Sequence, residues 1–219
     1  MIDEIVPVGA ASAECFGDVP EATLYPEERA ALGKAGEARR LEFTTVRHCA
    51  RRALGRLGLP PTPLLPGMRG APRWPDGVAG SMTHCAGYRA AAVAHCSDVR
   101  ALGIDAEPHE PLAEGLLDYI AVPDERGPVS RLVTQHPEVH WDRLLFCAKE
   151  AVYKAWFPVT QRWLSFHDAE VSLSPDGSFR ARILAAPPAG QPVPPGGFEG
   201  RWLARNGFLL ACATDPRPV

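Results

Sequence analysis

Two carboxylates stand two residues apart in the segment GIDAE, at Asp105 and Glu107. In a β-strand such residues project from the same face, roughly 7 Å apart along the strand. Carboxylates this close repel each other unless protons or a cation lie between them, and oxygen ligands suit Mg²⁺. The spacing is therefore consistent with a magnesium site, although a solvated strand end is the commoner explanation of so short a motif.

A second pair of charged groups interrupts the apolar helical segment LLFCAKEAVYKAWF (144–157), at Glu150 and Lys154. At about 100° per residue, the apolar side chains gather on one side of the helix and Glu150 lies nearly opposite. A glutamate four residues before a lysine is commonly a surface ion pair worth about 0.3–0.5 kcal/mol. Phe146 and Tyr153 nevertheless make this face unusually apolar, which favours its being covered by another part of the protein or by a ligand.

Two further segments carry groups suited to phosphate. Residues 80–83 (GSMT) are predicted to form a small-residue loop with backbone donors and hydroxyls, and His84 follows it. A helix is predicted over 26–57, broken near residues 33–36, and its arginines are Arg39, Arg40, Arg47, Arg51, Arg52 and Arg56. Arginines on a helix are usually solvated, and a lone histidine is more often structural than catalytic. Alone, neither segment establishes a binding site.

The elements that must position these groups are predicted from periodicity and turn residues. Strands over 88–96 and 100–107 are expected to form a hairpin that turns at Ser97 and Asp98. Helices are expected over 112–120, 124–134 and 140–157. Alternation near the C-terminus predicts antiparallel strands, with turns at 175–177 and 206–207 and a proline-rich loop at 187–195. The predicted fold class is therefore α+β.

Composition limits the classes of protein. Apolar residues make up 46% and charged residues 22%, which is ordinary for a globular chain with a buried core. The net charge of −3 argues against general nucleic-acid binding, and no apolar stretch approaches the length of a membrane span. The acidic start lacks the basic region of a signal peptide, so we expect a cytoplasmic protein without nucleic-acid or membrane partners. The six scattered cysteines are expected to be reduced thiols, and the three His-Cys pairs are poorly spaced for zinc.

In their order along the chain, these segments resemble the stand-alone 4′-phosphopantetheinyl transferases, especially their actinobacterial branch. The resemblance covers about residues 25 to 165, and the C-terminus fits it more loosely. The pair G-I-D-x-E and F-x-x-K-E-x-x-x-K-A is specific for that family. The matching segments are RRLEFTTVRHCARRAL (39–54), WPDGVAGSMTHCAGYRAA (74–91), GIDAEPH (103–109) and WDRLLFCAKEAVYKAWF (141–157).

The resemblance implies both a fold and an activity. Members move the phosphopantetheine arm of coenzyme A onto a serine of an apo acyl or peptidyl carrier protein and release adenosine 3′,5′-bisphosphate. Their fold is two similar α/β lobes related by a pseudo-twofold axis, with the active site in the cleft between them. We therefore expect an N-terminal lobe over 1–102, a C-terminal lobe over 103–219, and a monomer.

The resemblance also implies roles for individual residues. Asp105, Glu107 and Glu150 would hold Mg²⁺, with Mn²⁺ as an alternative. Glu150 would also act as the base, directly or through a water, and Lys154 would stabilise or protonate the leaving oxygen, with Lys149 as a second cation nearby. The residues expected to bind the coenzyme are Arg39, Arg40, Arg47, Ser81, Thr83, His84, Lys149 and Lys154.

One position departs from the family pattern. Relatives often carry a lysine in the loop before the G-x-x-G-x-P-x-W segment, where it can reach the 3′-phosphate, and this chain has Pro66 there. Arg69, three residues later, is the nearest alternative group for that phosphate. A solvated loop charge is the competing interpretation of Arg69.

Two other classes of protein fit parts of the pattern. A Mg²⁺-dependent phosphohydrolase would use the same three carboxylates and would release phosphate from a small substrate with no carrier protein present. A non-catalytic binder of coenzyme A or carrier proteins is the second alternative. Glu150 and Lys154 argue against the binder, because binding without turnover has no physical need for them.

Overall fold

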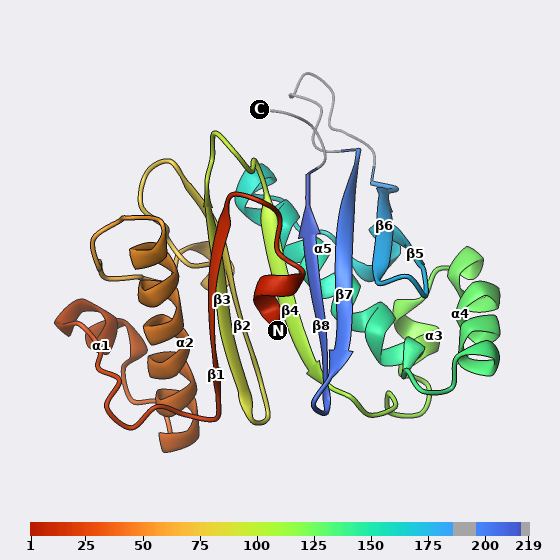
Figure 1. Cartoon of the computed structure of the whole chain (residues 1–219), viewed down its shortest axis with the longest axis horizontal. Coiled ribbons are helices and arrows are strands. Elements are labelled where there is room, and N and C mark those ends of the chain that lie inside the picture. The colour runs from red at the N-terminus through yellow and green to blue at the C-terminus, as the bar shows by residue number, and fades with distance from the viewer. Residues whose placement is uncertain (186–195, 216–219) are drawn as a thin grey trace.

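The computed structural model describes residues 1–185 and 196–215, and its fold is α+β, as predicted (Figure 1). The strands are β1 Ala10–Phe16, β2 Val78–Cys85, β3 Tyr88–His95, β4 Leu102–Pro108, β5 Ala169–Leu173, β6 Ser178–Ile183, β7 Gly197–Arg205 and β8 Phe208–Thr214. The α-helices are α1 Pro26–Leu32, α2 Glu37–Arg56, α3 Leu116–Ile120, α4 Pro123–Gln135 and α5 Trp141–Thr160. Short 3₁₀ helices are η1 Ile2–Glu4, η2 Met68–Gly70 and η3 Phe166–Asp168.

The first sheet has the antiparallel order β1-β3-β2, with β3 in the centre. Ala91 and Val93 of β3 pack in the core shared with α2, while Ala90 and Ala92 face a second core. The predicted hairpin between 88–96 and 100–107 is therefore wrong. β3 is buried on both faces and pairs with a strand on each edge. Its partners are β2 and β1, and β1 was not predicted.

The second sheet has the antiparallel order β4-β8-β7-β6-β5, and α5 packs along β4 and β8. Gly103 makes this close packing feasible. A Cβ atom at that position would lie 2.0 Å from the carbonyl oxygen of Ala151 and 2.5 Å from the amide nitrogen of Ala155. The backbone of α5 therefore approaches β4 at the one residue type that leaves room, which brings the polar side of α5 beside the carboxylates of β4.

The two sheets meet where β2 runs beside β4 (Figure 1). The amide of Ile104 donates to the Ser81 hydroxyl, and the amide of Ala106 donates to the Thr83 hydroxyl, each at 3.0 Å. Residues 80–83 are thus part of a strand and not the predicted loop. Their hydroxyls join the sheets because they replace backbone carbonyls as acceptors for the β4 amides.

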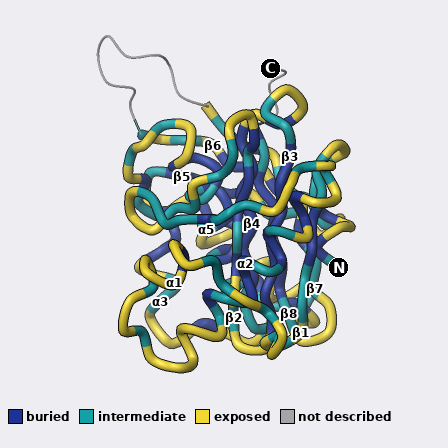
Figure 2. The backbone as a smooth tube through the Cα atoms, turned by 90° about the vertical axis from the view of Figure 1, so that its left-hand side faces the viewer, coloured by how far each residue is buried: buried dark blue, intermediate teal, exposed yellow. Residues whose placement is uncertain are grey.

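The first sheet with α1 and α2 forms an N-terminal lobe, and the second sheet with α3, α4 and α5 forms a C-terminal lobe, as the resemblance implied. Side chains of both sheets and of η1 share one core, in which Tyr88, Ile104 and Leu210 are fully buried. Figure 2 shows these central strands as the most buried part of the chain. The division at residues 102 and 103 stays a prediction.

Several local expectations are confirmed. The N-terminal helical segment is broken between α1 and α2, where Gly33 adopts a φ of 61°. Turns join β5 to β6 and β7 to β8 at the predicted places. The predicted proline-rich loop at 187–195 lies outside the described residues.

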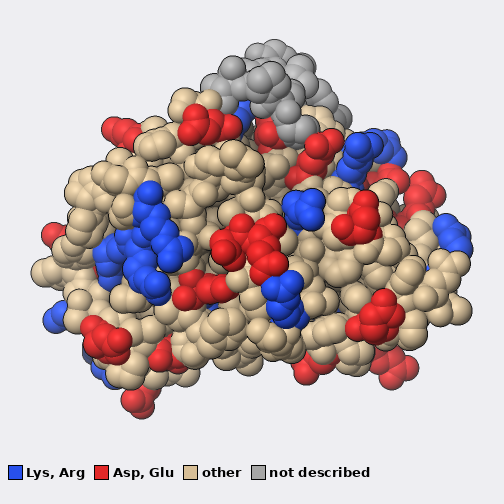
Figure 3. Space-filling model, viewed as in Figure 1, with Lys and Arg blue, Asp and Glu red and all other residues tan. Residues whose placement is uncertain are grey.

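The charged side chains are unevenly spread over the surface. Figure 3 shows a group of basic side chains on the side of α1 and α2, with acidic side chains nearer the middle of that face. Within residues 1–185 and 196–215, the helices are all too short or too polar to cross a bilayer.

Candidate active site

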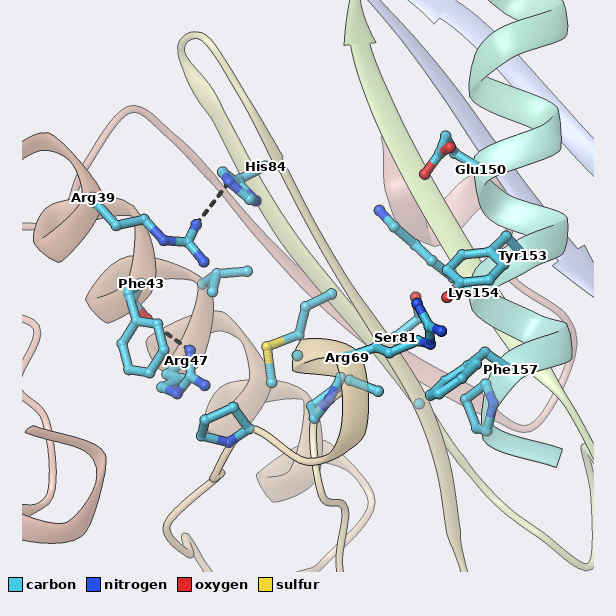
Figure 4. Close-up of a pocket in the computed structure, with 18 residues that line it drawn as sticks. Arg39, Phe43, Arg47, Arg69, Ser81, His84, Glu150, Tyr153, Lys154 and Phe157 are labelled. Atoms are coloured by element: carbon cyan, nitrogen blue, oxygen red, sulfur yellow. Dashed lines mark hydrogen bonds between the residues drawn. The ribbon is translucent and has the colours of Figure 1, made fainter. Parts of the chain in front are cut away.

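A cavity of about 290 Å³ lies between the two lobes (Figure 4). One wall is formed by α2 and by the loop around Arg69, and the opposite wall by α5. Strand β2 lies between them. The cavity brings together residues that are far apart in the sequence, among them Arg39, Arg47, Ser81, His84, Glu150 and Lys154.

Arg47 forms the deepest charged part of the α2 wall and is 5% exposed. Its Nε donates to the carbonyl of Leu64 at 2.8 Å, and its guanidinium lies over the ring of Phe43. Burial lowers the pKa of Arg47 to about 10, which still leaves the guanidinium protonated at neutral pH. The α2 wall therefore presents a fixed positive charge.

Arg39 and His84 are brought together across the cavity from α2 and β2, as Figure 4 shows. Arg39 Nη1 lies 3.1 Å from His84 Nε2. Burial lowers the pKa of His84, while the Glu42 carboxylate, 3.5 Å away, acts in the opposite direction. The ring is therefore an acceptor for the arginine. Arg40, by contrast, is exposed and is not among the described side chains that line this cavity.

Glu28 holds this wall in place, although the sequence suggested only a favourable charge at a helix start. Its side chain is fully buried. The carboxylate accepts hydrogen bonds from the amides of Tyr25 and Leu64, at 3.0 and 2.8 Å, and pairs with Arg51 at 2.9 Å. It thereby joins α1, α2 and the chain that precedes the Arg69 loop.

We expect Glu28→Ala to lower the free energy of unfolding by about 3–5 kcal/mol, because it leaves a partly buried arginine and a buried amide without their partner. Urea denaturation measures the change. Glu27→Ala is the matched control, since Glu27 is an exposed residue in the same helical turn. Equal effects of the two substitutions would contradict the structural role of Glu28.

Asp105 lies at the bottom of the acidic side of the site and is 5% exposed. Its Oδ1 accepts hydrogen bonds from Lys154 Nζ at 2.6 Å and from the Thr83 hydroxyl at 3.1 Å. Its Oδ2 is buried and has no hydrogen-bond partner among the residues that the structure describes. A buried carboxylate oxygen without a partner costs free energy, so this atom is suited to a further cation.

The negative charge of Asp105 acts on both Glu107 and Glu150. Burial, followed by the charge of Asp105, raises the pKa of both glutamates. Arg143 opposes the shift at Glu107, to which it donates a hydrogen bond at 3.0 Å, and Lys154 opposes it at Glu150. In the described part of the chain no three potential ligands converge closely enough to hold a metal as they stand.

Lys154 forms an ion pair with Asp105 on β4. The surface ion pair with Glu150, one helical turn away, is not formed among the described residues. Burial opposes the charge on Lys154, but the carboxylates of Asp105 and Glu150 raise its pKa. The ammonium group is therefore retained at neutral pH. It lies between the two strands that meet at the lobe boundary, because Thr83 of β2 is also within 3.4 Å.

Lys149, which was predicted as a second cation beside Lys154, has partners inside the C-terminal lobe. Its Nζ pairs with the buried Glu125 at 2.9 Å and donates to the carbonyls of Phe166 and Ala169. Adjacent residues on a helix point about 100° apart, and the Lys149 ammonium group is directed to Glu125. Its charge is used inside the C-terminal lobe.

Ser81 and Thr83 were predicted to contact phosphate, but their hydroxyl groups have other hydrogen-bond partners. Both hydroxyls accept hydrogen bonds from β4, and both residues are buried. Ser81 still lines the cavity, whereas Thr83 lies against Asp105 and Lys154. The difference arises because residues 80–83 belong to strand β2 and not to the predicted loop.

A second cavity, of about 270 Å³, adjoins the first and shares Glu150 and Tyr153 with it. Aromatic side chains form much of its lining, including Tyr119, Trp163 and Phe166. Lys149 also contributes to its wall. The two cavities together offer a charged chamber and a more aromatic one on either side of Glu150.

Arg143 is a site residue that the sequence interpretation missed. It pairs with Glu107 and lies seven residues before Glu150 on α5. Residues seven apart share a helix face, so this spacing was a usable signal. Glu28 and Glu42 also have partners in distant segments, Leu64 for Glu28 and His84 for Glu42, which local spacing does not indicate.

Comparisons with known proteins agree with this geometry. Residues 27–94 match the model of the 4′-phosphopantetheinyl transferase N-terminal domain, and residues 101–193 match that of the 4′-phosphopantetheinyl transferase superfamily. The chain is 50% identical, over its whole length and 91% of the relative, to 4′-phosphopantetheinyl transferase Svp of Streptomyces mobaraensis. It is 49% identical to the transferase PptT of Mycobacterium tuberculosis, over 91% of this chain and 89% of that protein. With Npt of Nocardia iowensis the identity is 47% over 96% of this chain and 97% of the relative. The chain therefore belongs to the 4′-phosphopantetheinyl transferase superfamily.

Proposed function

We propose that this protein transfers the 4′-phosphopantetheine arm of coenzyme A to a serine of an apo acyl or peptidyl carrier protein, with Mg²⁺ as its metal. The second product is adenosine 3′,5′-bisphosphate. The observation that carries the proposal is one cavity with fixed cations on the α2 wall and Glu150, Lys154 and nearby Asp105 on the other side. A monomer acting in the cytoplasm, without nucleic-acid or membrane partners, belongs to the same proposal.

The basic wall suits the adenylate end of coenzyme A. Arg47 is held by Leu64 and Phe43, and Arg39 by His84, so both guanidinium groups are positioned before a ligand binds. Positioned guanidinium groups bind phosphate with little further loss of side-chain freedom. We therefore assign the 3′-phosphate to this wall, and Arg40 at most to its rim.

The acidic side fits a divalent cation by the chemistry of its donors. Asp105, Glu107 and Glu150 would hold it, and the free Oδ2 of Asp105 is the strongest single indication. Burial, and after it the charge of Asp105, raises the pKa of both glutamates, and a divalent cation among the three carboxylates would oppose that shift. When bound, Mg²⁺ would neutralise charge on the diphosphate and stabilise the leaving phosphate.

The reacting groups would be supplied by α5. A raised pKa makes Glu150 a better acceptor for the proton of the carrier serine, because a base works best when its pKa is near the operating pH. Lys154 keeps its proton and can stabilise the charge that develops on the leaving oxygen. The second cavity would hold the pantetheine arm, since it opens beside Glu150 and is lined by aromatic side chains.

We expect Mg²⁺ to raise the melting temperature of the protein. At a concentration one hundred times its dissociation constant, a ligand stabilises the native state by about 2.7 kcal/mol, or roughly 5–10 °C for a chain of this size. Differential scanning fluorimetry with and without EDTA measures the shift. Glu107→Gln should reduce it, whereas Glu110→Gln, an exposed residue three positions later, should leave it unchanged. A shift that both variants retain would contradict the carboxylate assignment.

A phosphohydrolase is the competing enzyme class, and product analysis separates the two. A transferase releases adenosine 3′,5′-bisphosphate from coenzyme A only when an apo carrier protein is present. A hydrolase releases a phosphorylated product without it. Chromatography of the nucleotide products, with and without carrier protein, tests the proposed function.

A further inference from the structure

The loop between Pro66 and Pro72 holds Arg69 in an unusual conformation. The two prolines form an isolated β-bridge, and the Gly67 amide donates to the carbonyl of Ala71 at 2.7 Å. Arg69 itself has a φ of 54° and a ψ of 24°, in the left-handed region that a non-glycine residue seldom adopts. Such a conformation persists only when the surrounding structure fixes it, so the loop presents this side chain in a defined direction.

The Arg69 side chain reaches across the lobe boundary to the C-terminal lobe. Its guanidinium carbon lies 5.1 Å from the ring centroid of Trp163, which is a cation–π distance. Trp163 is 59% exposed and packs edge-on against Tyr153, with centroids 5.2 Å apart. Within the described ranges, Arg69 makes no ion pair with a carboxylate, so Trp163 is its clearest partner.

This contact lies where the two cavities join. Arg69 lines the charged cavity, Trp163 lines the aromatic one, and Tyr153 lines both. In Figure 4, Arg69 lies toward Tyr153 and Phe157, whereas Arg39 and Arg47 lie on the far side of the cavity. Arg69 is therefore directed at the passage between the cavities more than at the basic wall.

We propose that Arg69 and Trp163 form a clasp that closes over the pantetheine arm where it passes from the charged cavity to the aromatic one. The inference rests on the proposed function and makes both residues positioning residues for the donor. It replaces the sequence-based expectation that Arg69 reads the 3′-phosphate. A clasp over the arm recognises donors that carry the arm, whether or not they carry the 3′-phosphate.

The test is a double-mutant cycle on ligand binding. Dissociation constants of coenzyme A, dephospho-coenzyme A and adenosine 3′,5′-bisphosphate are measured by calorimetry for Arg69→Ala, Trp163→Ala and the double variant. Each single variant should weaken both arm-bearing ligands to the same extent, about 2- to 5-fold, because either truncation removes the same cation–π contact. The double variant should be no weaker than the singles, and the bisphosphate, which lacks the arm, should bind as in the parent.

Two further variants are matched controls. Trp163→Phe keeps an aromatic face and should retain most of the affinity, which a role in overall stability alone would not predict. Arg73→Ala removes an exposed arginine near the same loop and should change nothing. Melting temperatures of all variants should stay close to that of the parent, because both clasp residues lie at the surface.

Three outcomes would overturn the clasp. If Arg69→Ala weakens coenzyme A and the bisphosphate but spares dephospho-coenzyme A, Arg69 reads the 3′-phosphate. If the losses in the double variant add, the two residues act separately. If no ligand changes affinity, the contact has no role in binding. These measurements need no turnover, so a protein that binds coenzyme A without transferring its arm would refute the proposed function and still test the clasp.

Discussion

Asp105→Asn should lower the rate of transfer by about a hundred- to a thousandfold or more while the protein remains folded. Among the proposed metal ligands, this carboxylate has a buried oxygen without a hydrogen-bond partner in residues 1–185 and 196–215. An amide of the same size can still accept the hydrogen bond from Lys154, but it cannot supply the charge that a divalent cation requires. Removing one charge also relieves the repulsion from Glu107 and Glu150, so the loss in stability should be small.

Initial rates with coenzyme A, Mg²⁺ and an apo carrier protein measure this effect, and circular dichroism measures the fold. Asp118→Asn is the control, because its side chain is 76% exposed and is not among the described side chains that line either cavity. An Asp105→Asn variant with near-parental turnover in Mg²⁺ would show that the metal assignment is wrong.

Lys154→Ala and Lys149→Ala should have opposite consequences, although the two lysines lie five residues apart on α5. Loss of Lys154 should reduce kcat by about a hundred- to a thousandfold, because it removes the cation beside Asp105 and Glu150. Saturating Mg²⁺ would neutralise the carboxylate of Asp105, which loses its partner when Lys154 is removed, and would keep the variant folded. Loss of Lys149 should instead lower the free energy of unfolding by about 3–5 kcal/mol, because Glu125 would be left buried without its partner.

Urea denaturation and steady-state rates, measured for both variants, separate the two roles. A surface ion pair at position 154 would give a small change in stability and an unchanged rate. That result would remove Lys154 from the proposed chemistry. A Lys149→Ala variant that stays stable but loses activity would return Lys149 to the site.

The pattern of local features was largely predictable from the sequence. The apolar stripe of α5, including Trp141, Leu144 and Trp156, is buried as the helical periodicity indicated. The alternation around Asp105 correctly indicated a strand, and the structure adds that the backbone of α5 fills the space beside Gly103. Such helices and strands can be predicted from the spacing of apolar residues along the chain, because that spacing follows from backbone geometry.

Strand pairing was not predictable in the same way. Adjacent segments 88–96 and 100–107 suggested a hairpin, yet β3 pairs with β1 and β2. Pairing depends on which faces are buried in the assembled fold, and a strand buried on both faces carries little local information about its neighbours. The roles of Ser81 and Thr83 were not predictable for the same reason. Their hydroxyl groups accept hydrogen bonds from β4, which lies 23 residues further along the chain.

Buried ion pairs were the second limit. Lys149 was expected in the site beside Lys154, no pattern indicated that Glu28 or Glu125 is removed from water, and all three are almost fully buried. Charge type and spacing show which groups can pair, but only the packed structure shows which of them are removed from water. Asp105 and Lys154 were assigned to one site through the family resemblance and not through their spacing.

Intact-mass analysis of an apo carrier protein, incubated with coenzyme A, Mg²⁺ and this protein, tests the central claim most directly. The account predicts that the carrier gains the mass of one phosphopantetheinyl group. It also predicts no gain in a carrier whose acceptor serine is replaced by alanine, and none when EDTA replaces Mg²⁺. A carrier mass that stays unchanged with active, folded protein at equimolar concentration would contradict the transferase assignment for this chain.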